Sequence, residues 1–273
     1  MGQIIVLSGV TAQAGANAPR ITMSAADRVA MRMPYLKHAV SANELTPVAG
    51  EGLQGRCRVT GTKLITTGAG KANMALLNRA GHLGVGGSVL SSAMALKLPD
   101  GSATASYTIV VAFNIGTSTG SIYTTTRQLL NGFSAEGVLA NQMLTASGAA
   151  NPTEAYKSKM LSVGIGTFSP FSIVNMPPSL SWGVVAIDFN NDTGVVSLSL
   201  DGISWSSVQR VVGGNTIGGT GYVTIGMPTT TAGLTDNLVG DTFIFGESLR
   251  AKSSDSAIAS LIAAMKADYG IVA

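Results

Sequence analysis

The chain has 273 residues and a formal net charge of +3, and only 11% of its residues are charged, against about 25% in ordinary soluble domains. A single cysteine, Cys57, excludes a disulfide framework within the chain. The length suits one large all-β domain with an appendage, because sandwiches extend to about 200–250 residues as a single unit.

The positive charge gathers near the N-terminus, where residues 1–63 hold seven Lys or Arg and three acidic residues. These basic residues are dispersed and have few aromatic neighbours, unlike a nucleic-acid site, so we expect no nucleic-acid partner. No apolar run approaches the roughly 18 residues of a membrane span, so no membrane insertion is expected. The start of the chain also lacks the features of a signal peptide.

The first 55 residues are predicted to form an arm or small subdomain. A helix is expected after Ser24, which would be its N-cap, with Asp27 at the third helical position and Pro34 ending the helix. Small residues and glycines at 49–55 predict the boundary with the main domain, residues 56–273.

The arm is predicted to anchor the protein to neighbouring subunits, because a segment that cannot bury its own core needs a partner surface. A short apolar run could pair with a strand edge of another subunit, and the helix would add its apolar side chains. The predicted assembly residues are Ile4, Ile5, Val6, Leu7, Val29 and Met33.

From residue 56 onward, short apolar runs alternate with turn-forming clusters, which is typical of antiparallel strands. The odd-numbered apolar residues from Tyr107 to Ile115 share one face, with Val110 and Ala112 opposite them, so this strand should be covered on both faces. Expected strands are 58–60, 63–67, 74–77, 107–115, 127–132, 159–165, 184–189, 195–200, 222–227 and 241–246. No fixed repeat period emerges, so propeller and solenoid folds are unsupported.

The C-terminal part carries the clearest patterns. In 195–200, Val196, Leu198 and Leu200 alternate with Ser197 and Ser199, so one face can be buried. After residue 245 the period changes to that of a helix capped by Ser253 or Ser254, which should pack flat on the sandwich. The apolar stripe of this helix is Ile258, Leu261, Ile262, Met265 and Tyr269, and Gly270 stops it.

These patterns resemble the concanavalin A-like, or laminin G-like, jelly-roll domains. The resemblance rests on 107–115, the hairpin 182–202, GYVTIG at 221–226 and GDTFIFGESLRAKSSDSAIASLIAAMKADYGI at 240–271. In that family a strand similar to GDTFIFGESL precedes a capped helix ending near a Tyr-Gly pair. The resemblance covers 56–273 and implies a fold rather than an activity, since such domains are common in bacteriophage virion proteins, lectins and glycosidases. The composition also resembles that of a tailed-phage structural protein.

A calcium site is the first candidate that the sequence offers, because Asp188, Asn190, Asp192 and Gly194 are spaced like a cation-binding loop. The register argues against it, since an EF-hand loop needs Gly at its sixth position and Glu at its twelfth, where Thr193 and a serine stand. The favoured interpretation is a polar hairpin turn. We expect no metal and no cofactor.

Catalytic groups are also sparse. Glucanases of the resembled fold carry E-x-D-x-x-E on one strand, whereas the five Glu of this chain include no such pattern. The isolated acids Asp201, Asp236, Asp241 and Glu247 are assigned to hairpin turns and solvated edges. His38 and His82 are the only imidazoles, and both are expected to be structural or solvated.

The remaining candidates are one cysteine, two glycine clusters and two tryptophans. Cys57 is interpreted as a small buried residue. The glycine clusters GAGK at 68–71 and GHLGVGG at 81–87 miss phosphate-binding spacings and are predicted to be turns, which places His82 in a loop. For a glycan site, which would need an exposed aromatic, Trp205 is the weak candidate, although packing is favoured for both Trp182 and Trp205.

The sequence therefore predicts an all-β concanavalin A-like jelly-roll sandwich with a short N-terminal arm and a C-terminal helix. The first functional hypothesis is a non-enzymatic structural protein of a phage particle, located on the virion and partnered by itself and neighbouring virion proteins. The alternatives are a lectin-like module that binds a host surface glycan, and a degenerate glycoside hydrolase.

Overall fold

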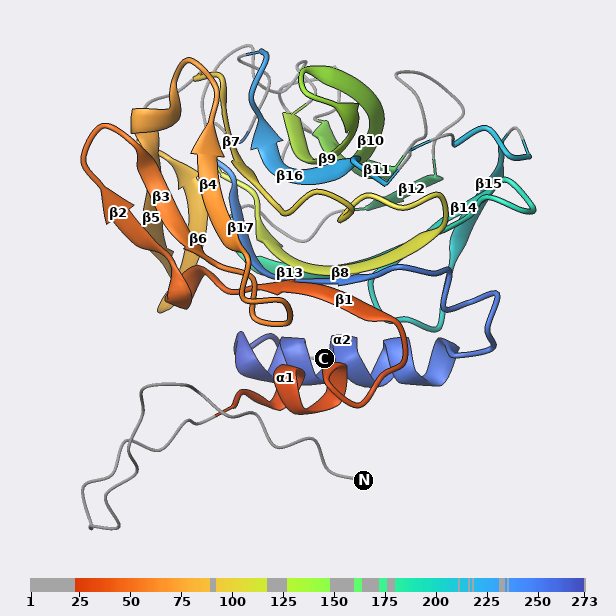
Figure 1. Ribbon diagram of the computed structural model, residues 1–273. Coiled ribbons are helices and arrows are strands. Elements are labelled where there is room, and N and C mark those ends of the chain that lie inside the picture. Colours follow the sequence, from red (N-terminus) through yellow and green to blue (C-terminus); the bar gives the residue numbers. More distant parts are fainter. Residues whose placement is uncertain are drawn as a thin grey trace, which may run out of the picture.

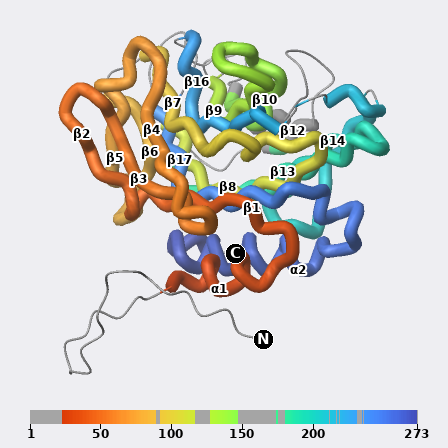
Figure 2. Tube along the Cα trace, viewed as in Figure 1, coloured from red at the N-terminus to blue at the C-terminus, as the bar shows by residue number. Residues whose placement is uncertain are grey.

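The computed structural model describes residues 23–88, 92–116, 127–147, 160–163, 172–175, 180–210, 212–215, 217, 219–230, 234 and 236–272. Two antiparallel sheets stack face to face, and two helices cover the outer side of one of them (Figure 1). The Cα trace shows the same three layers (Figure 2). The prediction of an all-β sandwich with a closing helix is confirmed.

The first sheet, sheet A, has eight strands in the order β15-β14-β13-β8-β17-β6-β5, with β1 also paired to β17. Its strands are β1 (Leu36–Val40), β5 (Met74–Arg79), β6 (His82–Gly87), β8 (Tyr107–Asn114), β13 (Trp182–Asn190), β14 (Val195–Ser199), β15 (Ser206–Gln209) and β17 (Leu238–Phe245). The ladder between β13 and β8 is unbroken from Trp182 opposite Asn114 to Phe189 opposite Tyr107.

The second sheet, sheet B, has nine strands in the order β12-β11-β10-β9-β16-β7-β4-β3-β2. They are β2 (Thr46–Val48), β3 (Gly52–Arg56), β4 (Lys63–Thr67), β7 (Met94–Lys97), β9 (Arg127–Ala135), β10 (Val138–Ser147), β11 (Met160–Val163), β12 (Ser172–Asn175) and β16 (Tyr222–Met227). The short 3-10 helices η1 (Ala42–Glu44) and η2 (Lys71–Asn73) complete the connections in this half of the chain.

Apolar side chains fill two separate cores. The inter-sheet core lies between the sheets and takes the odd-numbered residues of β8, from Tyr107 to Phe113. The helix-side core lies between sheet A and the helices, and takes Val110 and Ala112 from the other face of the same strand. The prediction that this strand is covered on both faces is confirmed, because period-two alternation sends successive side chains to opposite faces.

Both helices lie on sheet A and contact each other. Helix α1 (Ala25–Ala30) begins with a capping box in which the Ser24 hydroxyl accepts from the Asp27 amide, as predicted from the sequence. Helix α2 (Asp255–Asp268) has Ser254 at its N-cap and buries the predicted stripe in the helix-side core. Tyr269 follows the helix and is also buried there.

Sheet pairing crosses the predicted boundary at residue 55. Strand β1 pairs with β17 along the part that β6 leaves open, and β2 and β3 extend sheet B through β4. The second half of the predicted arm therefore supplies strands to both sheets, because its short apolar runs bury themselves against the main domain. Residues 1–22 lie outside the described residues.

Two local predictions are wrong. The expected strand 58–60 is a turn between β3 and β4, closed by the Gly61 amide on the Cys57 carbonyl, with Gly61 at φ +69°. The glycine run after Gly81 is strand β6 rather than a turn, and His82 begins it. Glycine is required inside β6 because a Cβ on Gly84 would lie 2.7 Å from the Leu238 side chain.

Candidate functional site

A pocket of about 490 Å³ opens where the start of α1, the β5–β6 hairpin, β17 and the end of α2 meet. Its lining is mainly polar and comes from segments that are far apart in the chain. We call it the Asp241 pocket, and its polar lining residues are Ser24, Asn43, Asn78, His82, Asp241, Asp268 and Tyr269. Asn43 and Asn78 are exposed, whereas Asp241 and Tyr269 are buried, so the pocket extends from the surface inward.

One wall of the pocket is aromatic. The Tyr269 ring lies 4.9 Å from the His82 ring and 4.7 Å from the Trp182 ring, measured between centroids. Trp182 is fixed from behind by a hydrogen bond from Nε1 to the Arg79 carbonyl. The Tyr269 hydroxyl accepts from the Asp241 amide at 2.8 Å, and burial raises the pKa of this phenol. His82 and Tyr269 thus form the aromatic part of the lining, and Trp182, which does not line the pocket, packs against both rings.

Asp268 ties the end of α2 to the start of α1. Its two carboxylate oxygens accept from the Ala25 amide at 3.2 Å and the Ala26 amide at 2.8 Å. These amides belong to the first turn of α1 and have no partner inside the helix. The Asp268 carboxylate therefore satisfies them and positions Ser24 at the edge of the pocket.

Asp241 is the most unusual side chain of the pocket. It is only 8% exposed, and its Oδ1 has no hydrogen-bond partner among the described residues. Burial raises the pKa of Asp241, while the hydrogen bond from Ser41 and the charge of Arg58 act in the opposite direction. A buried acceptor without a donor costs free energy, so a function or a ligand is the expected reason for keeping it.

Negative charge dominates the surroundings of Asp241. Arg58 donates to both carboxylate oxygens of Asp27, at 2.5 and 2.7 Å, and its Nε lies 3.0 Å from Glu44. Burial is the main cause that raises the pKa of Glu44, and Asp27 and Asp241 add to it. Titratable or charged groups that interact with Asp241 are Asp27, Glu44, Arg58, Asp268 and Tyr269. One guanidinium, that of Arg58, thus interacts with three carboxyl groups, those of Asp27, Glu44 and Asp241.

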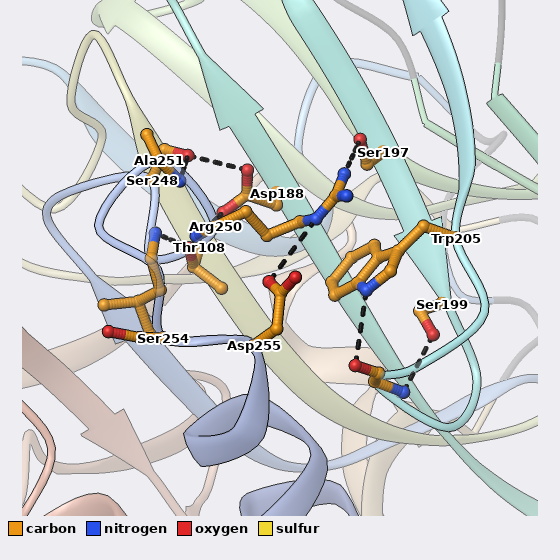
Figure 3. A network of polar contacts seen from close by, with 12 residues as sticks. Thr108, Asp188, Ser197, Ser199, Trp205, Ser248, Arg250, Ala251, Ser254 and Asp255 are labelled. Atoms are coloured by element: carbon orange, nitrogen blue, oxygen red, sulfur yellow. Dashed lines mark hydrogen bonds and ion pairs between the residues drawn. The ribbon is translucent and has the colours of Figure 1, made fainter.

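The calcium candidates from the sequence do not converge. Asn190 Oδ1 accepts from the Asp192 amide in the turn between β13 and β14, and Asp192 points to solvent. Asp188 is buried and accepts from the Thr108 hydroxyl at 2.5 Å and the Ser248 hydroxyl at 2.7 Å (Figure 3). The described residues contain no group of three or more His, Cys, Asp or Glu that could hold a metal.

Trp205, the weak glycan candidate, belongs to the polar network that holds the β17–α2 connection (Figure 3). Its Nε1 donates to the Gly202 carbonyl at 3.2 Å, and the Arg250 guanidinium lies 4.4 Å from the centre of its ring. Arg250 also donates to the Ser197 hydroxyl at 2.7 Å. One face of the indole is therefore occupied by the chain's own cation.

The predicted assembly residues have different outcomes. Ile4, Ile5, Val6 and Leu7 lie outside the described residues. Met33 is 8% exposed and is part of the helix-side core, and Val29 packs against that core. The structure thus gives both side chains partners within their own chain.

Cys57 and His38 form a thiol–imidazole pair that the sequence analysis does not predict. Cys57 Sγ lies 3.4 Å from His38 Nδ1, and both residues are buried. Burial raises the pKa of Cys57, but hydrogen bonds from His38, Thr60 and Ala39 outweigh it and lower the pKa to about 6. At 1% exposure the thiol is closed to a substrate, which agrees with its interpretation as a small buried residue.

The pocket escaped prediction because its parts carry no local signature. Asp241 was assigned to turns and solvated edges, yet it lies in the interior of β17 and is buried. The sequence signal that could have raised suspicion is an acid inside an apolar strand, LVGDTFIF, flanked by residues that are all buried.

No helix among the described segments is long and apolar enough to cross a membrane.

Comparisons with known proteins support the fold and nothing finer. No protein-family model and no curated protein sequence match this chain. Among solved structures, domain 4 of an extracellular arabinanase from Geobacillus stearothermophilus, in complex with arabinotriose, is 16% identical with a TM-score of 0.50. That alignment covers 83% of this chain and 98% of the arabinanase domain. This likeness supports a jelly-roll-like β-sandwich fold.

A second group of similar structures belongs to a larger enzyme. Trypanosoma rangeli sialidase, as a covalent intermediate with difluorosialic acid, is 15% identical with a TM-score of 0.55, and the alignment covers 86% of this chain and 33% of the sialidase. The same sialidase in complex with sialic acid is 17% identical with a TM-score of 0.52. This chain therefore spans about a third of the sialidase. At these identities the likeness extends to the β-sandwich alone.

Proposed function

We propose that this chain is a glycan-binding module and that the Asp241 pocket holds an oligosaccharide. The observation that carries the proposal is the combination of an aromatic wall with convergent carboxylate, amide and imidazole groups in one pocket. A sugar presents hydroxyl donors and acceptors at its rim and apolar C–H groups on its faces, so it can use both kinds of surface. The volume of about 490 Å³ lies within the range of about 300–1,000 Å³ typical of small-molecule sites.

The structural neighbours supply a first probe. The Geobacillus domain was solved with arabinotriose, and the alignment with this chain covers 98% of that domain. Arabinotriose is therefore the first ligand to test, followed by a broad glycan array.

Binding without cleavage is the second part of the proposal. Glycoside hydrolysis needs two carboxyl groups that reach the scissile bond from opposite sides. Here both oxygens of Asp268 accept from helix amides, and Asp241 is 8% exposed. Asp268 therefore serves the helix ends, and Asp241 is too enclosed to reach a scissile bond, so we propose that the pocket binds a glycan without cleaving it. A reducing-sugar assay on each bound glycan tests this part, and release of new reducing ends would contradict it.

The binding prediction is tested by calorimetry on two pocket variants. Asn78→Ala and His82→Ala should each weaken binding by at least about tenfold, equivalent to about 1.4 kcal/mol, because each removes a polar group from the pocket lining. Gln209→Ala is the matched control, since this exposed amide lies on β15, at the opposite edge of sheet A from β5. No binding to arabinotriose or to any glycan on the array, or pocket variants that bind like the unmodified chain, would refute the proposal.

A structural role in a phage particle stays a second proposal. It is supported by the sparse charge, 11% of residues, which gives little solubility to a free surface. Self-association, neighbouring virion proteins as partners and a location on the virion all belong to this proposal. A glycan-binding sandwich displayed on a particle would unite the two roles.

A further inference from the structure

We infer that the Asp241 pocket selects uncharged glycans and rejects acidic ones such as uronic, sialic or sulfated sugars. The inference rests on the proposed function, since it assigns a ligand class to the same pocket.

The charge around the pocket is one-sided. Asp241 and Asp268 line it, and no Lys or Arg belongs to the lining that the structure describes. Asp27 and Glu44 lie close enough to influence Asp241 or each other electrostatically. Arg58, the one cation in this group, is bound to Asp27 and Glu44 and is not part of the lining. An acidic sugar would therefore meet like charge with no cation to offset it.

The hydrogen-bonding capacity of the pocket favours the same ligand class. Asp241 and Asp268 are the two carboxyl groups of the described pocket lining. A carboxylate oxygen can only accept, so its natural partner is a donor such as a sugar hydroxyl. The carboxylate or sulfate of an acidic sugar has acceptors only and would leave Asp241 without a donor at that position. A neutral glycan offers hydroxyl donors to the carboxyl groups of the lining and adds no charge.

The low exposure of Asp241 strengthens this discrimination. Charges in a partly desolvated pocket interact more strongly than charges in water, because less solvent screens them. By contrast, two acidic side chains on an exposed sheet surface would repel an anion weakly, and only at low salt concentration. Asp241 is held in the interior of β17 and packed beside Tyr269, so added salt should weaken its effect only in part.

The test compares pairs of glycans that differ in one acidic group. A glycan array that carries neutral sugars beside their uronic, sialylated and sulfated counterparts gives the first result, and calorimetry with galactotriose and trigalacturonate, whose rings differ in the C6 carboxylate, gives the second. We expect neutral ligands to bind at least tenfold more tightly than their acidic counterparts. Acidic glycans that bind equally or more tightly would overturn the inference and leave the proposed function intact, whereas an array without any bound glycan would overturn both.

Two charge variants separate electrostatic rejection from a poor steric fit. The gap is the ratio of the affinities for a neutral glycan and for its acidic counterpart. Asp241→Asn should narrow this gap by at least threefold. Glu44→Gln should narrow it in the same direction, although Glu44 does not line the pocket, and this variant keeps the test valid if Asp241→Asn fails to fold. Glu136→Gln is the matched control and should leave the gap unchanged, because Glu136 is an exposed acid in the turn between β9 and β10 of sheet B. A gap that neither pocket-side variant changes would show rejection by shape and overturn the electrostatic argument.

Discussion

At the residue scale, the same side-chain type serves opposite purposes in different surroundings. Asp201 lies in a turn where its Oδ1 accepts from the Ile203 and Ser204 amides, at 2.8 and 2.7 Å. Burial is the largest single influence and raises the pKa of Asp201, but the hydrogen bonds together outweigh it and lower the pKa to about 2. Asp241 sits in a buried strand with one oxygen unpartnered within the described chain, and burial raises its pKa. The number of hydrogen bonds that an aspartate accepts and its degree of burial, rather than its residue type, decide whether it stabilises the fold.

Asp241→Asn is therefore expected to raise the melting temperature at pH 7. A raised pKa in the folded state means that the fold binds the proton more tightly than the unfolded chain does, so this stabilisation is complete below about pH 3.9 and is lost as pH rises through the folded-state pKa. At pH 7, where the unfolded chain carries this group ionised, its burial costs the fold free energy, and the neutral amide removes that cost. The difference from the unmodified chain should shrink as the pH falls toward 4.

Asp201→Asn is the control of opposite sign. Its lowered pKa means that the ionised form stabilises the fold above about pH 3.9, and that this contribution is lost as pH falls toward 2. This variant should melt at a lower temperature than the unmodified chain at pH 7, by a small amount because the side chain is largely in contact with solvent. Thermal melts from pH 3 to 8 measure both variants, and an Asp241→Asn protein that is less stable at pH 7 would contradict the argument.

At the element scale, close packing between β17 and the end of α2 shapes the pocket. A Cβ on Gly240 would lie within 3 Å of the Tyr269 ring and 3.1 Å from the Trp182 ring. Glycine at this position lets the Tyr269 hydroxyl reach the backbone of β17 and accept from the Asp241 amide. The aromatic wall thus depends on a missing side chain in the strand beneath it.

Gly240→Ala should destabilise the protein by about 1–3 kcal/mol, the usual cost of forcing an added methyl group into a packed site. It should also weaken glycan binding, since Tyr269 must move. Gly219→Ala is the control: a Cβ there meets no atom within 4 Å, and the change should stay within about 0.5 kcal/mol. Urea unfolding measures both variants, and equal stability of the two proteins would contradict the packing argument.

At the scale of the whole molecule, the N-terminal segment from Ser24 to Arg56 is part of the sandwich and of the pocket. It supplies β1 to sheet A, β2 and β3 to sheet B, and two of the polar groups that line the pocket. Removing residues 1–55 would therefore take away strands of both sheets together with Ser24 and Asn43 of the pocket lining. The segment 1–22 precedes all of these elements, so its contribution to assembly can be tested separately.

Deleting residues 1–22 tests the assembly proposal. If the apolar run from Ile4 to Leu7 pairs with neighbouring subunits, the full chain should have an oligomeric mass in solution, and the shortened chain should have the mass of one subunit. Ile5→Asp in the full chain should act in the same direction, because a charge disfavours edge pairing. Light scattering after size-exclusion chromatography gives the masses. A monomeric full chain, or one oligomer size for all three proteins, would contradict anchoring by this run.

The sequence by itself determined what depends on local pattern. Alternation in β8 and β14, the stripe of α2 and the capping box at Ser24 all follow from side chains within a few residues of one another, so period and propensity suffice to predict them. The glycine-rich strand β6 escaped prediction, because its glycines are required by Leu238, far away in the chain.

Only the tertiary structure decided the site. The pairing of β1 with β17 and the meeting of His82, Asp241 and Tyr269 join segments that share no local signature, since each side chain is explained by a neighbour distant in sequence. In the sequence, Asp241 resembles the aspartates of turns, and only the fold shows that it lies buried beside Tyr269. Local physics fixed the strands and helices, and long-range packing placed the Asp241 carboxyl group in the lining of the pocket.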